Sequence, residues 1–216
     1  MATNDTGPYL IVGLGNPGAD YAGHRHNVGF MAIDALAGVL RADVFSKKFH
    51  GEAAQATSGR QKLILLKPLT YMNNSGRAVQ AAASFYKIPP ENIIVLHDEL
   101  DLPVGKLRIK KGGGANGQNG IRDIDACIGK EYWRIRLGIA HPGNKEQVHG
   151  HVLSNFGKDD RLTTYALLDA LARYFPLFWE HSPEALMSKV TDALAPPREK
   201  KPATNAAPAD KAADSK

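Results

Sequence analysis

The chain has 216 residues, of which 43% are hydrophobic, so it can bury a substantial core within one domain. Cys127 is the single cysteine, which excludes an internal disulfide framework, and no apolar run approaches the roughly 20 residues needed to cross a bilayer. The N-terminal stretch MATNDTGPYL lacks the basic region and apolar core of a signal peptide. We therefore expect a cytoplasmic protein without a membrane association.

The formal net charge is +5, and its location along the chain is informative. Residues 105–136 contain eight Lys and Arg against three Asp and Glu, so this segment alone accounts for the excess of the whole chain. A run of charge is most simply a solvated face, but this one lies beside a glycine-rich loop. The concentration of cations there favours a phosphate-rich partner.

Expected strands and helices alternate along the chain. Short apolar runs predict strands at 9–15, 50–57, 62–68, 92–98, 106–111 and 134–140. Helical spacing of apolar residues predicts helices at 28–40, 74–86, 119–129, 159–180 and 183–194, and Pro176 should kink or end the fourth of these. The strands at 50–57 and 62–68 are expected to form one hairpin, and the two strands around Gly105 another.

This alternation predicts an α/β fold, a single domain with a twisted mixed β-sheet and helices packed on both faces. The domain should span residues 9–194, between a flexible N-terminus at 1–8 and a charged tail at 195–216. The tail has no large apolar residue, so burial cannot offset the entropy of ordering it. We expect the tail to be disordered.

The stretch GLGNPGADYAGHRHNVGF, residues 13–30, follows the first expected strand and contains the G-x-G-x-x-G spacing of dinucleotide-binding proteins. That fingerprint needs its last glycine at a helix N-terminus, close to the pyrophosphate. Here helical spacing resumes only at Val28, ten residues after Gly18, and no acidic residue ends a second strand at the required distance. A dinucleotide site is therefore disfavoured.

Polar residues follow the expected strands at the ends where an α/β sheet places its ligand crevice. They are mainly amides, with imidazoles, phenols and a carboxylate: Asn16, Tyr21, His24, His26, Asn27, Tyr71, Asn73, Asn74, Asp98, Asn116 and Asn119. Taken singly, Asn73, Asn74 and Asn119 are more simply explained as turn or helix-cap residues. Together, neutral amides suit a substrate that mixes carbonyl, hydroxyl and N–H groups.

Three kinds of chemistry compete for this crevice. The acids of HDELDLP (97–103) could bind a metal with His24 or His26, but the stretch has no recognised ligand spacing, and a solvated turn explains the acids as simply. A serine nucleophile would need a G-x-S-x-G elbow, which the chain lacks. The remaining chemistry is a histidine that acts on water, with Asp98 to orient the ring and to stabilise the imidazolium.

Four motifs carry a resemblance to a known family: GLGNPGADYAGHRHNVG, TYMNNSG, HDELDLPVG and KKGGGANGQNG. In this order and at these intervals they closely resemble the bacterial peptidyl-tRNA hydrolase family, over about residues 9–194. The resemblance implies a single α/β domain, usually monomeric, whose partner is peptidyl-tRNA. It also implies hydrolysis of the ester between the peptide and the terminal ribose of the tRNA, with no metal and no cofactor.

The resemblance implies roles for individual residues. His26 matches the general base, Asp98 the carboxylate that supports it, and Asn16 the residue thought to help separate peptidyl-tRNA from aminoacyl-tRNA. Lys110 and Arg136 resemble the pair that binds the 5′ phosphate of the tRNA. Further substrate-binding positions are matched by Tyr21, Tyr71, Asn73 and Asn119.

The chain departs from the family pattern at three positions. Tyr71 stands where phenylalanine is common, which preserves an aromatic surface. Ala115 and Gln118 replace two histidines of the glycine-rich loop, so the resemblance does not fix what that loop contributes to RNA contact. Two rival hypotheses stay open, a non-catalytic RNA-binding protein on the same fold and a metal-dependent amidase that a chelator would inactivate.

Overall fold

The computed structural model of the protein describes residues 7–195. The expected flexible N-terminus and disordered tail therefore lie almost entirely outside the described residues. Within them, seven strands form one sheet in the order β2-β3-β4-β1-β5-β7-β6. The strands are β1 (Tyr9–Gly13), β2 (Ser46–Lys48), β3 (Gly51–Ser58), β4 (Gln61–Pro68), β5 (Ile93–Glu99), β6 (Leu107–Lys111) and β7 (Trp133–Gly138).

Parallel strands occupy the centre of the sheet and antiparallel strands its two edges. β1 pairs in parallel with β4 and β5, and β5 pairs in parallel with β7. β3 is antiparallel to β2 and β4, and β6 is antiparallel to β7. The predicted mixed sheet and the predicted hairpin between β3 and β4 are both confirmed.

The hairpin expected around Gly105 is wrong, because β7 lies between β5 and β6 and pairs with both. The connection from β5 to β6 crosses the carboxyl end of β7, where the Ala140 N–H donates to the Leu102 carbonyl. A Cβ on Gly138 would collide with the Pro103 carbonyl, so glycine is needed for this close crossing. Local periodicity cannot reveal a strand that inserts from later in the chain.

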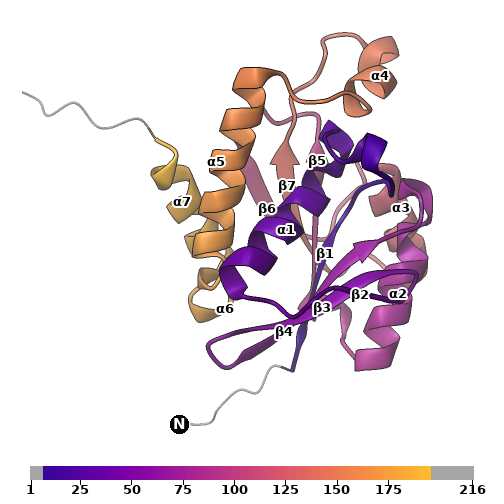
Figure 1. Ribbon diagram of the computed structural model, residues 1–216, viewed down its shortest axis with the longest axis vertical. Helices are drawn as coiled ribbons and strands as arrows, with labels where there is room; N and C mark the ends of the chain where they lie inside the picture. The colour runs from indigo at the N-terminus through magenta and orange to yellow at the C-terminus, as the bar shows by residue number, and fades with distance from the viewer. Residues whose placement is uncertain (1–6, 196–216) are drawn as a thin grey trace, which may run out of the picture.

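Helices cover both faces of the sheet, as predicted (Figure 1). The α-helices are α1 (Val28–Leu40), α2 (Ser75–Tyr86), α3 (Asn119–Ile128), α4 (Val148–Val152), α5 (Lys158–Tyr174), α6 (Leu177–Glu180) and α7 (Pro183–Ala193). Because side chains alternate along a strand, Ile94 and Leu96 of β5 pack in the core with α1 and α5, whereas Ile93 and Val95 pack in the core with α2 and α3. Pro176 separates α5 from α6, as expected.

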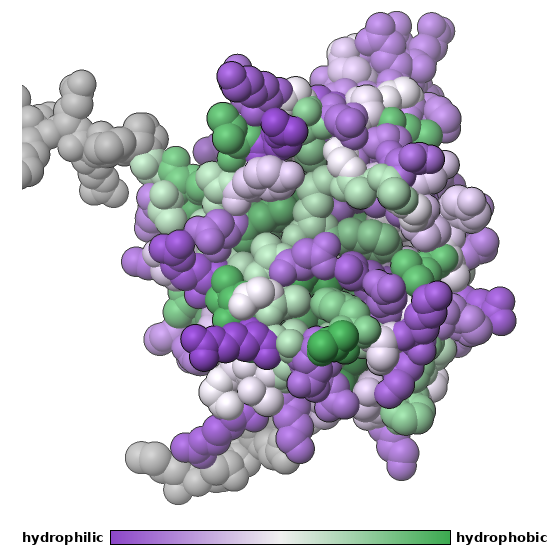
Figure 2. All heavy atoms as spheres, viewed as in Figure 1, coloured by the Kyte–Doolittle hydropathy of each residue, from purple (hydrophilic) through white to green (hydrophobic). Residues whose placement is uncertain are grey.

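The face formed by α1 and α5 shows apolar residues in its hollowed middle and hydrophilic residues over most of its rim (Figure 2). Val39 of α1 is 50% exposed and Tyr165 of α5 is 54% exposed, and both line a shallow groove between the two helices. Among residues 7–195, no helix combines the length and the apolar character needed to cross a membrane.

The carboxyl ends of the parallel strands meet at one edge of the sheet. The segments that follow β1, β4, β5 and β7 therefore converge there, as expected for the crevice of an α/β fold. The short helix α4, which follows β7 and has no buried residue, lies above this edge (Figure 1). Together with the glycine-rich loop before α3, these segments bring residues from five regions of the chain to one place.

Candidate active site

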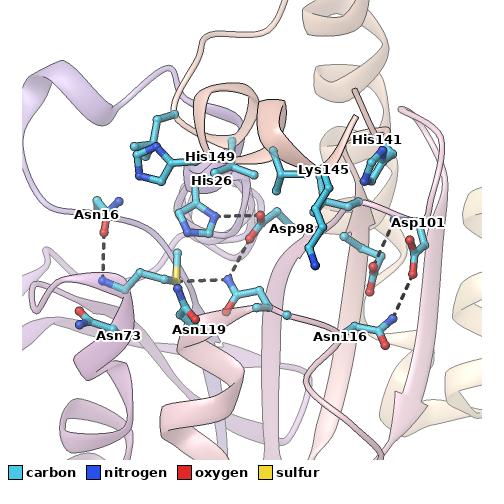
Figure 3. A pocket seen from close by; sticks show the side chains of 18 of the residues that line it. Asn16, His26, Asn73, Asp98, Asp101, Asn116, Asn119, His141, Lys145 and His149 are labelled. Atoms are coloured by element: carbon cyan, nitrogen blue, oxygen red, sulfur yellow. Dashed lines mark hydrogen bonds and ion pairs between the residues drawn. The ribbon is translucent and has the colours of Figure 1, made fainter. Parts of the chain in front are cut away.

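A cavity of about 900 Å³ opens at this edge of the sheet (Figure 3). Its walls come from the segments after β1, β4 and β5, the glycine-rich loop before α3, and residues 141–153 around α4. The lining residues are Asn16, His26, Tyr71, Met72, Asn73, Asp98, Glu99, Leu100, Asp101, Asn116, Gly117, Gln118, Asn119, His141, Lys145, Val148, His149, Val152 and Leu153.

His26 and Asp98 lie side by side in the wall of this cavity. His26 belongs to the 3-10 turn η2 (Arg25–Asn27), and its Nδ1 lies 2.8 Å from Oδ2 of Asp98 in β5. A carboxylate oxygen accepts, so Nδ1 carries the hydrogen and Nε2 keeps its lone pair. The predicted pair of a base and its orienting carboxylate therefore has the geometry needed to remove a proton from water.

The surroundings favour the charged forms of both groups. Burial lowers the pKa of His26, but the charge and hydrogen bond of Asp98 outweigh it, and the pKa lies above the usual 6.5. Burial raises the pKa of Asp98, but His26 and a hydrogen bond from Gln118 outweigh it, and the pKa lies below its usual value. Asp98 is thus a carboxylate that stabilises the imidazolium formed when His26 takes a proton.

His97 points away from this chemistry. Burial lowers the pKa of His97, and the opposing charges of Asp98 and Glu99 do not restore it. The neutral ring donates from Nδ1 to the Asp98 backbone carbonyl at 2.8 Å. His97 therefore braces the backbone of β5 rather than lining the cavity.

Asn16 has its backbone and one end of its amide fixed. Its backbone N–H donates to Asn27 Oδ1 at 3.0 Å, and Asn27 Nδ2 donates back to the Asn16 carbonyl at 2.9 Å. Its side-chain Oδ1 accepts from the backbone N–H of Met72 at 3.0 Å. Because Oδ1 is occupied in this way, the amide NH2 is the end that Asn16 offers to the cavity.

The glycines of the first loop serve close packing. A Cβ on Gly13 would collide with the carbonyl of Gly29, and a Cβ on Gly29 would collide with the backbone of Leu14 and Leu96. The N-terminal turn of α1 can therefore press against the ends of β1 and β5, which sets the position of His26 just before it. The loop needs glycine for this backbone geometry, and dinucleotide binding is not required to explain it.

The other predicted substrate positions divide between the cavity and its surroundings. Tyr71, Asn73 and Asn119 line it, and Tyr71 is 62% exposed at the rim. Tyr21 does not line it, and its ring instead packs edge-on against His24, with centroids 5.3 Å apart. Asn119 also accepts a hydrogen bond from Arg122 at 3.1 Å.

Lys110 and Arg136 lie outside the cavity, on the neighbouring strands β6 and β7. Lys110 pairs in register with Arg134, and Arg108 with Arg136, so these four cations share one face of the two strands. Burial lowers the pKa of Lys110, and the nearby charges of Arg136 and Arg134 lower it further. Arg134 is buried against Asp125 at 2.7 Å, which leaves the other cations as the accessible part of this basic strip.

Arg136 is not a free cation. Its Nε donates to Oε2 of the buried Glu99 at 2.6 Å, an ion pair that the sequence did not indicate.

The helix caps also differ from expectation. Asn74 precedes α2 without a side-chain cap, and α3 is capped by Gln118 rather than by Asn119.

Residues 141–153 were not predicted to take part in the site. They contribute His141, Lys145 and His149 to the cavity wall, and their position after a parallel strand was the available signal. Arg25, the neighbour of His26, anchors the far end of this segment. Its guanidinium donates to Ser154 Oγ at 2.8 Å and to the Asn155 carbonyl at 2.5 Å.

In the part of the chain that the structure describes, the potential metal-ligating side chains do not gather into a metal centre. Within residues 7–195, no group of three or more His, Cys, Asp or Glu side chains is placed to hold a metal ion together. The acids of HDELDLP are used elsewhere: Glu99 pairs with Arg136, and Asp101 accepts from Asn116 Nδ2 at 3.2 Å.

Comparison with known proteins identifies the family. The family model described as peptidyl-tRNA hydrolase matches residues 10–201. The chain belongs to the peptidyl-tRNA hydrolase family. Among curated members of the family, it is 51% identical to the peptidyl-tRNA hydrolase of Agrobacterium fabrum, over 93% of this chain and 84% of that one. It is 54% identical to that of Bradyrhizobium diazoefficiens, over 85% of this chain and 87% of that one.

Solved structures of this family have the same fold. The crystal structure of peptidyl-tRNA hydrolase from Acinetobacter baumannii superimposes with a TM-score of 0.80 at 39% identity, covering 85% of this chain and 94% of that chain. The single α/β domain that the motifs implied is thereby confirmed, and so is the resemblance to the peptidyl-tRNA hydrolase family.

Proposed function

We propose that the protein hydrolyses the ester that joins a peptide, or an N-blocked amino acid, to tRNA. The observation that carries this proposal is the hydrogen bond of 2.8 Å between His26 and a buried Asp98, in the wall of a cavity that also receives the NH2 of Asn16. Membership of the peptidyl-tRNA hydrolase family supports tRNA as the substrate.

In the proposed reaction, Nε2 of His26 takes a proton from a water molecule as its oxygen attacks the ester carbonyl carbon. Asp98 stabilises the imidazolium without taking its proton. The bond between the carbonyl carbon and the ribose oxygen then breaks, and the imidazolium returns the proton to that oxygen. The products are a tRNA with a free terminal hydroxyl and a peptide carboxylic acid, which ionises to a carboxylate by releasing the second proton of the water to solvent.

The direct test is incubation of the protein with N-acetyl-aminoacyl-tRNA, with and without a chelator, followed by measurement of the released N-acetyl amino acid. Release that is unaffected by the chelator supports the proposal. Binding without release would favour the RNA-binding alternative, and release that stops on chelation and returns with added metal would favour the metal-dependent one.

We propose that Asn16 helps to separate blocked from free aminoacyl-tRNA. Asn16→Asp keeps an acceptor for the Met72 N–H but replaces the NH2 by a negatively charged oxygen. That oxygen repels a substrate carbonyl and attracts a free ammonium group, so the ratio of the two hydrolysis rates should fall by about 10-fold or more. The rates on N-acetyl-aminoacyl-tRNA and aminoacyl-tRNA measure it.

The control for Asn16 is Gln80→Glu, which also changes an amide into a carboxylate, at an exposed position of α2. Gln80 does not line the cavity, and its NH2 donates to the Cys127 carbonyl at 3.2 Å, so the rate ratio should stay as in the wild type. An Asn16→Asp enzyme that is folded and keeps the wild-type ratio would remove Asn16 from the specificity role.

We propose that Lys110 and Arg136 bind the 5′ phosphate of the tRNA. Lys110→Ala should weaken tRNA binding and lower the log–log dependence on salt by up to about one unit, because one counterion fewer is released. For Arg136 the suitable change is Arg136→Gln, because an amide NH2 can still donate to the buried Glu99. Binding is measured with 5′-phosphorylated and 5′-hydroxyl tRNA.

Removal of the 5′ phosphate should cost affinity in the wild type but add little to the loss in the double variant, since groups that share one contact are not additive. Lys189→Ala is the matched control. It removes a charge from α7, on the opposite face of the sheet, and should preserve the cost of phosphate removal. Full additivity in the double variant would place these two residues on another part of the RNA.

The remaining parts of the proposal concern the rim and the assembly. Tyr71 offers an exposed ring for stacking, and Asn73 and Asn119 offer amides beside it. Tyr21 is proposed to contact the substrate outside the cavity. We further propose that the protein acts in the cytoplasm as a monomer. Sedimentation of the purified protein at assay concentration would check the monomeric state.

A further inference from the structure

Gln118 sits between the N-terminus of α3 and the carboxylate that supports the base. Its Oε1 accepts from the Ile121 backbone N–H at 2.9 Å, which makes it the N-cap of the helix. Its Nε2 donates to Asp98 Oδ1 at 2.9 Å, and the same NH2 lies 3.2 Å from Met72 Sδ. Because the helix N–H can only be met by the oxygen, the orientation of the amide is determined, and its donor end must face Asp98.

The two oxygens of Asp98 consequently have separate partners. Oδ1 accepts from Gln118, and Oδ2 lies 2.8 Å from Nδ1 of His26 (Figure 3). Asp98 is 5% exposed and Gln118 is 8% exposed, so water does not compete freely for these oxygens. The carboxylate cannot rotate without losing the Gln118 bond, and Oδ2 is thereby held toward the imidazole.

The packing around Gln118 is tight enough to hold this amide in place. A Cβ on Gly120 would lie 2.7 Å from Met72 Sδ and 3.1 Å from Gln118 Oε1, so the adjoining turn of α3 leaves room for no larger residue. The N-terminus of a helix also favours a nearby negative charge. Gln118 connects that helix end to Asp98 by hydrogen bonds at both ends of one side chain.

We propose that Gln118 is a positioning residue for the reaction, which fixes the rotamer of Asp98 and through it the tautomer of His26 that leaves Nε2 free to accept a proton. This inference rests on the proposed function for its effect on catalysis. Which nitrogen of His26 carries the hydrogen can be measured without substrate. Gln118 acts through Asp98 and is not itself assigned a contact with the reacting atoms.

Two substitutions at Gln118 separate its roles. Gln118→Ser keeps an oxygen that caps a helix but cannot reach Asp98, whereas Gln118→Met keeps the volume but loses the cap. Their shared property is the loss of the donor to Asp98. Both should lower kcat about 10- to 100-fold with KM little changed, the range expected for one hydrogen bond to a charged group. Only Gln118→Met should also lose the stability that the cap provides.

The decisive readout is the imidazole 15N spectrum of His26 in the substrate-free protein. The share of the tautomer with hydrogen on Nδ1 should fall in both variants. Ser182→Ala, which removes the Ser182 cap from α7, is the matched control, and it should lower the melting temperature without changing the His26 spectrum or kcat. This control shows what the loss of a cap alone does.

The outcomes are distinct. A tautomer shift in both variants, with the shared loss of kcat, supports the proposal. An unchanged His26 spectrum in both variants overturns it, whatever happens to kcat, and so does a shifted spectrum with an unchanged kcat. If the wild-type protein releases no amino acid from N-acetyl-aminoacyl-tRNA, the proposed function fails, and the His26 spectra then still decide whether Gln118 positions Asp98.

Discussion

His26→Ala is expected to lower kcat by about 10² to 10⁴-fold while tRNA binding persists, because a general base acts on water and adds little to ground-state affinity. The loss should be close to complete, since the cavity holds no second imidazole paired with a buried carboxylate among the described residues. Single-turnover hydrolysis of N-acetyl-aminoacyl-tRNA measures the rate, and a filter-binding titration measures the affinity.

The control for this change is His181→Ala, which removes an exposed imidazole at the end of α6 and should leave kcat as it is. The pH profile gives an independent check. Only the neutral ring accepts a proton, and the pKa of His26 lies above 6.5, so kcat/KM should rise with pH through an inflection above that value. Wild-type rates in the His26→Ala enzyme would contradict the mechanism.

Asp98→Asn should also cause a large loss, about 10² to 10⁴-fold in kcat, by changing the tautomer of the base. Gln118 presents an NH2 to this side chain, so the oxygen of an asparagine would turn toward Gln118 and its own NH2 toward His26. Nδ1 of His26 would then have to accept, which leaves the hydrogen on Nε2, where the reaction needs a lone pair. Removal of the carboxylate should also move the pH inflection to lower pH, because burial alone lowers the pKa of His26.

The control for Asp98→Asn is the unfolding transition, because a buried group is being changed. The substituted amide remains hydrogen-bonded at both ends in this arrangement, so the melting temperature should fall only modestly. A folded variant with wild-type kcat would show that the carboxylate has no part in catalysis. A variant with low kcat and an unshifted pH inflection would show that the inflection belongs to another group.

Much of the fold and site could be predicted because the signals are local. Apolar runs predicted most of the strands. The rule that ligands bind at the carboxyl ends of parallel strands predicted that Asn16, His26 and Asp98 would lie close together. The structure brings all three to one cavity.

What could not be predicted depends on partners distant in the sequence. The insertion of β7 between β5 and β6 is set by the whole sheet and leaves no local pattern. The pairing of Arg136 with Glu99 follows from that insertion, since it puts the two residues on adjacent strands. Gln118 was visible only as a departure from a motif, and its double hydrogen bond required the relative position of α3 and β5.

Arg25 links the integrity of the fold to its chemistry. Arg25 is 9% exposed and lies between His24 and His26 in the sequence. Its guanidinium donates hydrogen bonds to Ser154 and Asn155, at the far end of the segment around α4. Local detachment of that segment would break these hydrogen bonds and leave the turn that carries His26 without their support. A partly unfolded copy of the protein would therefore lose the position of His26, the proposed base, together with one wall of its cavity.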